Sequence, residues 1–239
     1  MNEIKFFNYF DKIYIINLAS RADRRKEIEA QLEKINLSLH HPKVILYNAI
    51  KPLEAGEFPS IGARGCFLSH FGILQDAKNQ KYQRILIFED DLDLNKDFIE
   101  KSDLVLSELL TNDWHIFYGD HRIENLSEVN IKPLKIVNSG LVIGTTNFIG
   151  FNGLVIDALV NYFEMMLTRS GGDPLGGPMH VDGAYTWFRK QHKDFITAIA
   201  TPQLGYQRSS ASDIADLRWI EKIPFIHIIR IIKKKIKSL

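Results

Sequence analysis

The sequence predicts an α/β domain with a Rossmann-like, mostly parallel central sheet flanked by helices. Short apolar runs rich in β-branched and aromatic residues recur along the chain, as expected of buried strands. Longer segments with apolar residues at helical spacing separate these runs. Such alternation of strands and helices is typical of parallel sheets. The 239 residues, 45% of them hydrophobic, suffice for a single domain with a substantial core.

Seven apolar runs are expected to form strands. Residues 85–88 are all apolar, which is typical of a central strand that is covered on both faces. The later runs are less regular, because Gly144, Gly150 and Gly153 mark turns around them. In chain order, the expected strands are residues 13–16, 44–47, 85–88, 114–118, 141–143, 154–156 and 195–200.

Apolar residues spaced by three and four indicate helices between these runs. The first helix carries Ile28, Leu32 and Ile35 on one face, and Gly62 and Gly65 are expected to flank a loop before the second. Asp97 is placed to cap the third helix, and Asp157 the fourth. After the first, the expected helices are residues 66–78, 97–110, 157–167 and 182–192. The Gly- and Pro-rich residues 170–178 predict a mobile loop.

Charge and cysteine content narrow the class of protein. The net charge of +1 favours no polyanionic partner, so no nucleic acid is expected. The single cysteine, Cys66, permits no internal disulfide and is by default a small buried hydrophobe. The first twelve residues lack an apolar stretch of secretory length, and no run reaches the ~18 apolar residues of a membrane span. We therefore expect a cytoplasmic protein.

Three consecutive acids, Glu89, Asp90 and Asp91, directly follow the most apolar of the expected strands. Open α/β sheets bind ligands at the carboxyl ends of their strands. Buried neighbouring carboxylates need a cation or hydrogen-bond donors to offset their charge, and a divalent cation shared with substrate phosphates is one solution. A solvated loop that simply ends the strand fits the run equally well. Because side chains alternate along a strand, Glu89 and Asp91 should point together and Asp90 away.

Four segments, in order, carry a family resemblance. They are residues 13–18 with Arg21 and residues 23–25; the G-x-x-G-C-x-x-S-H segment at residues 62–70; the acidic run at residues 87–91; and Gln207 with residues 212–214. Together they resemble glycosyltransferase family 25, which includes bacterial lipopolysaccharide and lipooligosaccharide galactosyltransferases and collagen galactosyltransferases. The resemblance implies a GT-A-like fold, a UDP-sugar donor, and Mn²⁺ or Mg²⁺ as the cofactor.

Individual residues then receive expected roles. Asp91 and Glu89 are the expected metal ligands. Asp182 opens a predicted helix after the Gly/Pro-rich loop and is the expected catalytic base, although a plain helix cap suits it nearly as well. Surface charge is an equal alternative for Arg24, and core packing for His70. The expected donor-binding residues are Asn17, Leu18, Arg21, Arg24, Ser69, His70, Glu89, Asp90 and Gln207.

The chain ends in a basic segment. Residues 216–239 are expected to form an amphipathic helical tail beyond a transferase domain at residues 1–215. Cations crowd the tail beside Ile228, Ile232 and Ile236, which suits an anionic membrane surface, while docking on the core is the alternative. We therefore expect either a cytoplasmic enzyme or one bound peripherally to the cytoplasmic face of the inner membrane.

The expected function is the metal-dependent, inverting transfer of a hexose from a UDP-sugar. The hexose is galactose, with glucose as the alternative, and the acceptor is a lipid-linked or oligosaccharide acceptor of lipopolysaccharide or lipooligosaccharide. Two rivals remain. Asp91 and Asp93 superficially fit the D-x-D loop of haloacid-dehalogenase-type phosphatases, and a relative could bind carbohydrate without turnover.

Overall fold

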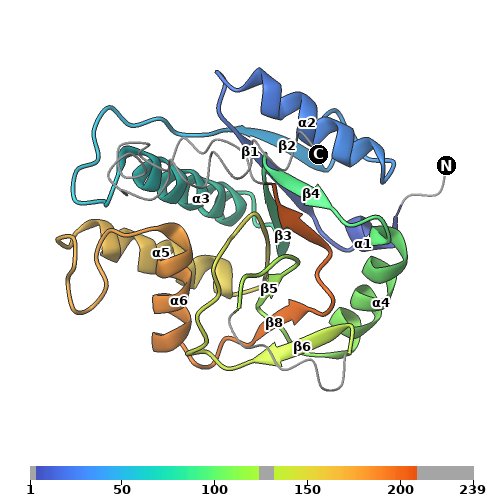
Figure 1. Cartoon of the computed structure of the whole chain (residues 1–239). Coiled ribbons are helices and arrows are strands. Elements are labelled where there is room, and N and C mark those ends of the chain that lie inside the picture. The colour runs from blue at the N-terminus through green and yellow to red at the C-terminus, as the bar shows by residue number, and fades with distance from the viewer. Residues whose placement is uncertain (1–3, 124–131, 209–239) are drawn as a thin grey trace, which may run out of the picture. The chain divides into compact units, whose positions relative to one another are not determined.

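The computed structural model describes residues 4–123 and 132–208, which belong to one compact unit, Met1–Ser209. A seven-stranded sheet in the order β2-β1-β3-β7-β5-β8-β6 runs through this unit, with helices on both faces (Figure 1). The sheet strands are β1 (Lys12–Asn17), β2 (Val44–Asn48), β3 (Arg84–Glu89), β5 (Ile116–Tyr118), β6 (Leu134–Val137), β7 (Phe148–Asn152) and β8 (Thr197–Ala200). A separate pair joins β4 (Leu92–Leu94) to β9 (Gly205–Gln207).

The sheet is largely parallel, as the sequence predicts. β1 pairs in parallel with β2 and β3, and β5 pairs in parallel with β8. β7 lies between β3 and β5, antiparallel to both, so β3 and β5 share one direction. β6 adds an antiparallel edge beside β8. The carboxyl ends of β1, β3, β5 and β8 therefore meet at one edge of the sheet, where β7 begins.

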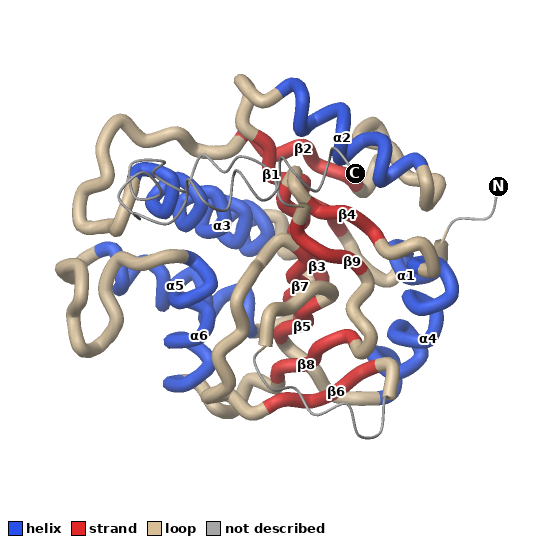
Figure 2. The backbone as a smooth tube through the Cα atoms, in the orientation of Figure 1, coloured by secondary structure: helices blue, strands red, loops and turns tan. Residues whose placement is uncertain are grey.

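Two apolar layers bury the sheet. The helices are α1 (Lys5–Asn8), α2 (Ala22–Glu33), α3 (Ile61–Asn79), α4 (Phe98–Thr111), α5 (Val155–Leu167) and α6 (Val181–Gln191). α3, α5 and α6 pack on one face through a core that includes Phe67 and Phe163, and α1, α2 and α4 pack on the other through a core that includes Phe6 and Leu32 (Figure 2). The apolar residues 85–88 of β3 are covered on both faces, which confirms the prediction of a central strand.

The second half of the sheet differs from the prediction. Residues 141–143 form no strand, and residues 154–156 begin α5 instead. Gly150 is not a turn residue: it lies inside β7, where a Cβ would come within 2.9 Å of Leu86 Cδ2. β4, β6, β7 and β9 were not predicted, and because β9 follows β8, the strand at residues 195–200 is not the last one.

α3 begins earlier than predicted, and it includes both glycines that were expected to flank a loop. Ser60 caps the helix, since its Oγ accepts a hydrogen bond from the Ala63 amide at 3.0 Å. Gly65 is needed for close packing, because a Cβ there would lie 2.6 Å from the carbonyl oxygen of Ile50. One turn later, Ser69 Oγ donates to Gly65 O and accepts from the Ile50 amide, at 2.7 and 2.8 Å. Gly65 and Ser69 thus hold the segment that follows β2 in close contact with α3.

Gly65→Ala is expected to lower the free energy of unfolding by about 1–3 kcal/mol, because the added methyl group must push the backbone of Ile50 away. Chemical denaturation measures this change. Gly183→Ala is the matched control inside α6, where a Cβ would meet only the flexible side chain of Met179. The control should be neutral or slightly stabilising, since alanine favours a helix over glycine by up to ~1 kcal/mol. Equal effects of the two changes would contradict the close-packing account.

Residues 170–178 are irregular, as predicted, but they are held by hydrogen bonds. Arg169 Nη1 donates to the carbonyl oxygens of Leu175 and Gly176 at 2.7 and 2.9 Å, and Glu57 accepts from the Gly171 amide at 2.9 Å. The predicted domain boundary at residue 215, the basic tail at residues 216–239 and the motif at residues 212–214 lie outside the described residues. Within the described part of the chain, no helix is both long and apolar enough to cross a membrane.

Candidate active site

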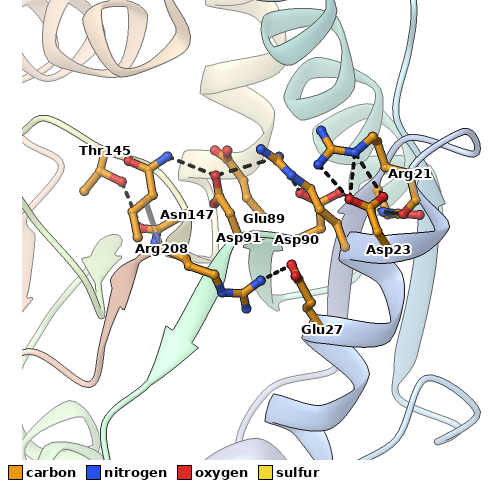
Figure 3. A network of polar contacts seen from close by, with 12 residues as sticks. Arg21, Asp23, Glu27, Glu89, Asp90, Asp91, Thr145, Asn147 and Arg208 are labelled. Carbon is orange, nitrogen blue, oxygen red and sulfur yellow. Dashed lines mark hydrogen bonds and ion pairs between the residues drawn. The ribbon is translucent and has the colours of Figure 1, made fainter. Parts of the chain in front are cut away.

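Polar residues gather where β1, β3 and β5 end and β7 begins. Asn17 closes β1, the run 89–91 follows β3, and Asp120 follows β5. Most of these side chains are buried: Asn17, Asp90, Asp91 and Asp120 expose 1%, 7%, 7% and 4% of their surface. Figure 3 shows the three acids of the run side by side between α2 and the segment before β7. This edge of the sheet is therefore a buried acidic site.

Asp90 faces α2 and the end of β1. Its carboxylate accepts hydrogen bonds from Asn17 Nδ2 at 2.7 Å and Arg24 Nη1 at 3.0 Å. Arg25 Nε in turn donates to Asn17 Oδ1 at 3.0 Å. Burial raises the pKa of Asp90, although these donors and the charge of Arg24 oppose the shift. Asp90 thus connects the acidic run to the arginines of α2.

Asp91 is the least compensated of the three acids. Gln207 Nε2 donates to its Oδ2 at 3.2 Å, and Arg24 Nη1 lies 3.9 Å from the same oxygen. The Oδ1 atom is buried and has no hydrogen-bond partner among the described residues. Burial, with repulsion from Glu89, raises the pKa of Asp91 to about 6. A buried carboxylate oxygen without a donor is well suited to binding a cation.

Glu89 turns toward α3. Its Oε1 accepts a hydrogen bond from Thr146 Oγ1 at 2.8 Å and lies 3.4 Å from His70 Nε2. Burial alone would raise the pKa of Glu89, but His70, Thr146 and Arg24 together lower it. Glu89 therefore carries its negative charge against α3, while Asp91 carries its own against β9. Asp90 faces α2 and away from Glu89, but Glu89 and Asp91 have different protein partners, and Asp91 shares Arg24 with Asp90.

Asp120 is a site residue that was missing from the sequence-based prediction. Burial raises the pKa of its carboxyl group to about 6, and the Asn147 side chain and the backbone of Gln207 oppose the shift. Gln207 thus approaches Asp120 with its backbone and Asp91 with its side chain. The signal was present in the sequence, because Asp120 follows the predicted strand at residues 114–118 just as the acidic run follows residues 85–88.

The two-stranded pair β4–β9 fixes the loop that carries Asp91. The Arg208 amide donates to the carbonyl oxygen of Asp91 at 2.7 Å, and Arg208 Nη2 donates to Asp93 Oδ1 at 2.7 Å. The same guanidinium pairs with Glu27 on α2 (Figure 3). Arg208 therefore ties both the acidic run and α2 to β9.

The other predicted donor-binding residues differ in how deeply they are buried. Leu18 is half-buried just after β1, and Arg21 pairs with Asp23 at 2.9 Å at the start of α2. The Ser69 side chain has no exposed surface, and its hydroxyl group is hydrogen-bonded to the backbone of α3 and of Ile50. Ser69 therefore has a structural role next to the site. The His70 ring is also fully buried, between Glu89 and Tyr185.

Asp182 lies in the first turn of α6 and is not the helix cap, since His180 occupies the cap position. Its carboxylate is half-buried and accepts a hydrogen bond from the Gly183 amide at 2.8 Å. Burial raises the pKa of the Cys66 thiol, and Glu89, Asp182 and Asp91 raise it further. The negative charge of Asp182 therefore acts on the Cys66 thiol from the first turn of α6. Tyr185 belongs to the core, with no exposed surface.

The oxygen ligands of this edge fit a hard divalent cation. Glu89 ends β3 and Asp91 lies in the turn between β3 and β4, and the unpartnered Oδ1 of Asp91 marks where a cation would be held. A separate hollow of about 480 Å³ is lined by residues such as Trp114, Asn152 and Ile196. It lies at the opposite end of the strands, where β5 and β8 begin and β7 ends, so it is not part of the acidic site.

Comparisons with known proteins agree with this geometry. The family described as "Glycosyltransferase family 25 (LPS biosynthesis protein)" matches residues 10–143. The relative "Probable inactive glycosyltransferase 25 family member 3" of Rattus norvegicus is 26% identical over 144 residues, covering 52% of this chain and 25% of the relative. "Procollagen galactosyltransferase 2" of Homo sapiens is 28% identical over 138 residues, covering 46% of this chain and 20% of that protein.

The first of these relatives are much longer proteins: the chain spans about a quarter of their length. Among solved structures, a glycosyltransferase involved in the glycosylation of the major capsid of PBCV-1 has a similar fold. It superposes with a TM-score of 0.50 at 12% identity, covering 84% of this chain and 93% of that chain. The similarity confirms a GT-A-like fold.

Proposed function

Since the chain belongs to glycosyltransferase family 25, we propose that it transfers a hexose from a UDP-sugar to a saccharide acceptor with the help of a divalent cation. The hexose is galactose, with glucose as the alternative. The acceptor is a lipid-linked or oligosaccharide acceptor of lipopolysaccharide or lipooligosaccharide, and the outcome is inversion. The observation that carries the proposal is the buried acidic run at the carboxyl end of β3, with Asp91 Oδ1 unpartnered among the described residues.

Asp91 and Glu89 would hold Mn²⁺ or Mg²⁺. The bound cation supplies charge neutralisation for the diphosphate leaving group. Asn17 ends β1 and donates a hydrogen bond to Asp90, which follows β3; these two residues would bind the nucleoside, with Leu18 next to Asn17. Arg24 already compensates Asp90 at 3.0 Å and is positioned to bind a phosphate as a charge-assisted donor. We propose that Arg21, at the start of α2, supplies a second positive charge for the phosphates.

Asp182 is the proposed catalytic base. An inverting transfer needs a carboxylate that accepts the proton of the acceptor hydroxyl as this oxygen attacks the anomeric carbon. Asp182 is half-buried in the first turn of α6, and its negative charge helps to raise the pKa of the Cys66 thiol. The neighbouring loop, residues 170–178, would then cover the acceptor side and exclude water.

The direct experiment incubates the protein with Mn²⁺ and a panel of UDP-sugars and measures the release of UDP. We expect UDP-galactose or UDP-glucose to be consumed and the other donors to remain intact. No release from any donor, with or without saccharide acceptors, would contradict the proposal. This result would favour a carbohydrate-binding relative without turnover, in keeping with the "inactive" description of some family members.

Metal binding should also raise the free energy of unfolding of the protein. Because a cation that binds the folded state relieves repulsion among Glu89, Asp90 and Asp91, Mn²⁺ at a hundred times its dissociation constant should add about 2.7 kcal/mol to the free energy of unfolding. Thermal unfolding with Mn²⁺, and then with excess EDTA, measures this gain and its reversal. An Asp97→Asn variant, altered on the surface of α4, should gain as much as the wild type. No shift with Mn²⁺ would argue against the site.

The phosphatase alternative receives no support from the site. Its D-x-D pattern requires Asp93 to be available beside Asp91, but Arg208 holds Asp93 Oδ1 through Nη2 and Nε at 2.7 and 3.1 Å. Hydrolysis of a simple phosphomonoester without a sugar nucleotide would revive this alternative. Peripheral membrane attachment through residues 216–239 remains part of the proposal, to be tested by comparing vesicle binding of the full chain with and without charge reversal in the tail.

A further inference from the structure

Cys66, His70 and Glu89 form a mixed cluster behind the acidic edge. Cys66 and His70 are one turn apart on α3, so their side chains share a face of the helix, and Glu89 ends β3 opposite them. One ligand atom from each residue lies within 4.8 Å of the ligand atoms of the other two. A sulfur, an imidazole nitrogen and a carboxylate oxygen therefore converge, which differs from the all-oxygen set at Asp91.

His70 is oriented as metal-binding histidines usually are. Its Nδ1 lies 3.1 Å from the Tyr185 hydroxyl, while Nε2 faces Glu89. Metal-ligating histidines typically engage the other ring nitrogen in a hydrogen bond, which fixes the ring. Although Nε2 is 3.4 Å from Glu89 Oε1, it makes no aligned hydrogen bond with a described residue, and the ring has no exposed surface. A buried ring nitrogen thus points into the cluster, toward the Glu89 carboxylate.

The spacing approaches that of a tetrahedral zinc site. Zinc bonds of ~2.0–2.3 Å place neighbouring ligand atoms about 3.3–3.8 Å apart. The separation of His70 Nε2 and Glu89 Oε1, 3.4 Å, already has this length. The Cys66 sulfur lies within 4.8 Å of one ligand atom of each of the other two residues, so a small adjustment of its side chain would complete the set. Cys66 as a residue is partly buried.

We propose that Cys66 Sγ, His70 Nε2 and the Glu89 carboxylate bind one thiophilic divalent cation of the Zn²⁺ type, with water as the fourth ligand. Thiolate and imidazole favour Zn²⁺ or Co²⁺ over the hard cations Mn²⁺ and Mg²⁺. Binding forms the metal–sulfur bond and releases the thiol proton to solvent. Since Glu89 would be shared, Zn²⁺ here and Mn²⁺ at Asp91 would compete. This consequence rests on the proposed function, whereas the zinc site itself does not.

The test uses metal-free full-length protein titrated with Co²⁺, a spectroscopic substitute for Zn²⁺. We expect a cobalt–thiolate charge-transfer band in the near ultraviolet that saturates at one Co²⁺ per chain and disappears when Zn²⁺ is added. Because Cys66 is the only cysteine of the chain, any such band must come from this residue. Absence of the band at saturating Co²⁺ would overturn the proposal.

Two comparisons make the result specific. Cys66→Ser keeps the size of the side chain and should abolish the band, and circular dichroism checks that the variant is folded. In the wild type, Zn²⁺ should slow the reaction of Cys66 with a thiol reagent at least tenfold, whereas Mg²⁺ should leave the rate unchanged. Equal labelling rates with and without Zn²⁺ would overturn the proposal even if Zn²⁺ binds to histidines elsewhere. Neither readout requires turnover, so failure of the transferase proposal would be seen separately.

Discussion

Asp91→Asn is expected to lower the rate of UDP release at least about a thousandfold while the protein remains folded. The amide keeps the shape of the side chain but loses the negative charge that would hold the cation. Loss of one preorganised charge contact in a buried site typically costs 10²–10³ in rate, and loss of the cation itself costs more. UDP release from the preferred donor with saturating Mn²⁺ is the measurement. Undiminished turnover would refute the metal assignment.

The stability of the same variant separates loss of function from loss of fold. In the metal-free protein the pKa of Asp91 is raised to about 6. The folded state then binds this proton more tightly than the unfolded state does, so the contribution of Asp91 to stability falls as pH rises from about 4 to 6. Asp91→Asn, which stays neutral, should therefore match or exceed wild-type stability at pH 8. Marked destabilisation at pH 8 would mean that the charge of Asp91 supports the fold.

Asp182→Asn is expected to lower kcat by about 10²–10⁴, the usual range for loss of general base catalysis. UDP affinity should stay within a few-fold of the wild type, because Asp182 would contact the acceptor and not the nucleotide. Initial rates over a range of donor and acceptor concentrations, combined with UDP binding, separate the two effects. The matched control is Asp157→Asn on the exposed side of α5, where Asp157 lies 3.9 Å from Lys78.

Asp120 provides the sharpest competitor for this role. It is more deeply buried than Asp182, and its pKa of about 6 would suit a base near neutral pH. If Asp182→Asn retained turnover while Asp120→Asn lost it with UDP binding intact, the base would be Asp120 and the assignment of Asp182 would be wrong. If both variants lost turnover, the change in UDP affinity would show which one disturbs the donor side.

The sequence was informative where periodicity was strong. The runs at residues 13–16 and 85–88 became β1 and β3, because continuous β-branched and aromatic residues suit a strand that is buried on both faces. The run at residues 44–47 became β2, a half-buried strand at the edge of the sheet. The acidic run was found from the same pattern, since it follows β3. That rule, applied to residues 114–118, would also have identified Asp120.

The second half of the chain was harder to predict from its sequence, for physical reasons. Gly150 reads as a turn residue, yet it sits inside β7 because Leu86 leaves no room for a side chain. Val155 and Ile156 favour a strand locally, but Leu159, Val160 and Phe163 continue a buried helical face, and α5 results. Antiparallel insertion of β7 between β3 and β5 depends on pairing between residues far apart in the chain, which local patterns do not contain.

The division of the acidic run was predicted only in part. The expected alternation separates Asp90, which faces Asn17 and Arg24, from Glu89, whereas Asp91 also lies near Arg24. It did not foresee that Glu89 would lie against His70 while Asp91 would lie against Gln207. These partners come from α3 and β9, and their approach is set by tertiary packing. Glu89 therefore lies between the proposed oxygen-ligand site at Asp91 and the proposed sulfur- and nitrogen-ligand site at Cys66 and His70.

Calorimetric titration of UDP into the protein, with Mn²⁺ and then with EDTA, tests the central claim most directly. The account predicts binding to one site per chain that weakens at least tenfold without the cation, and that is equally weak for Asp91→Asn in either buffer. UDP affinity that is the same with Mn²⁺ and with EDTA, or no UDP binding at all, would contradict a metal-dependent UDP-sugar site at the carboxyl end of β3.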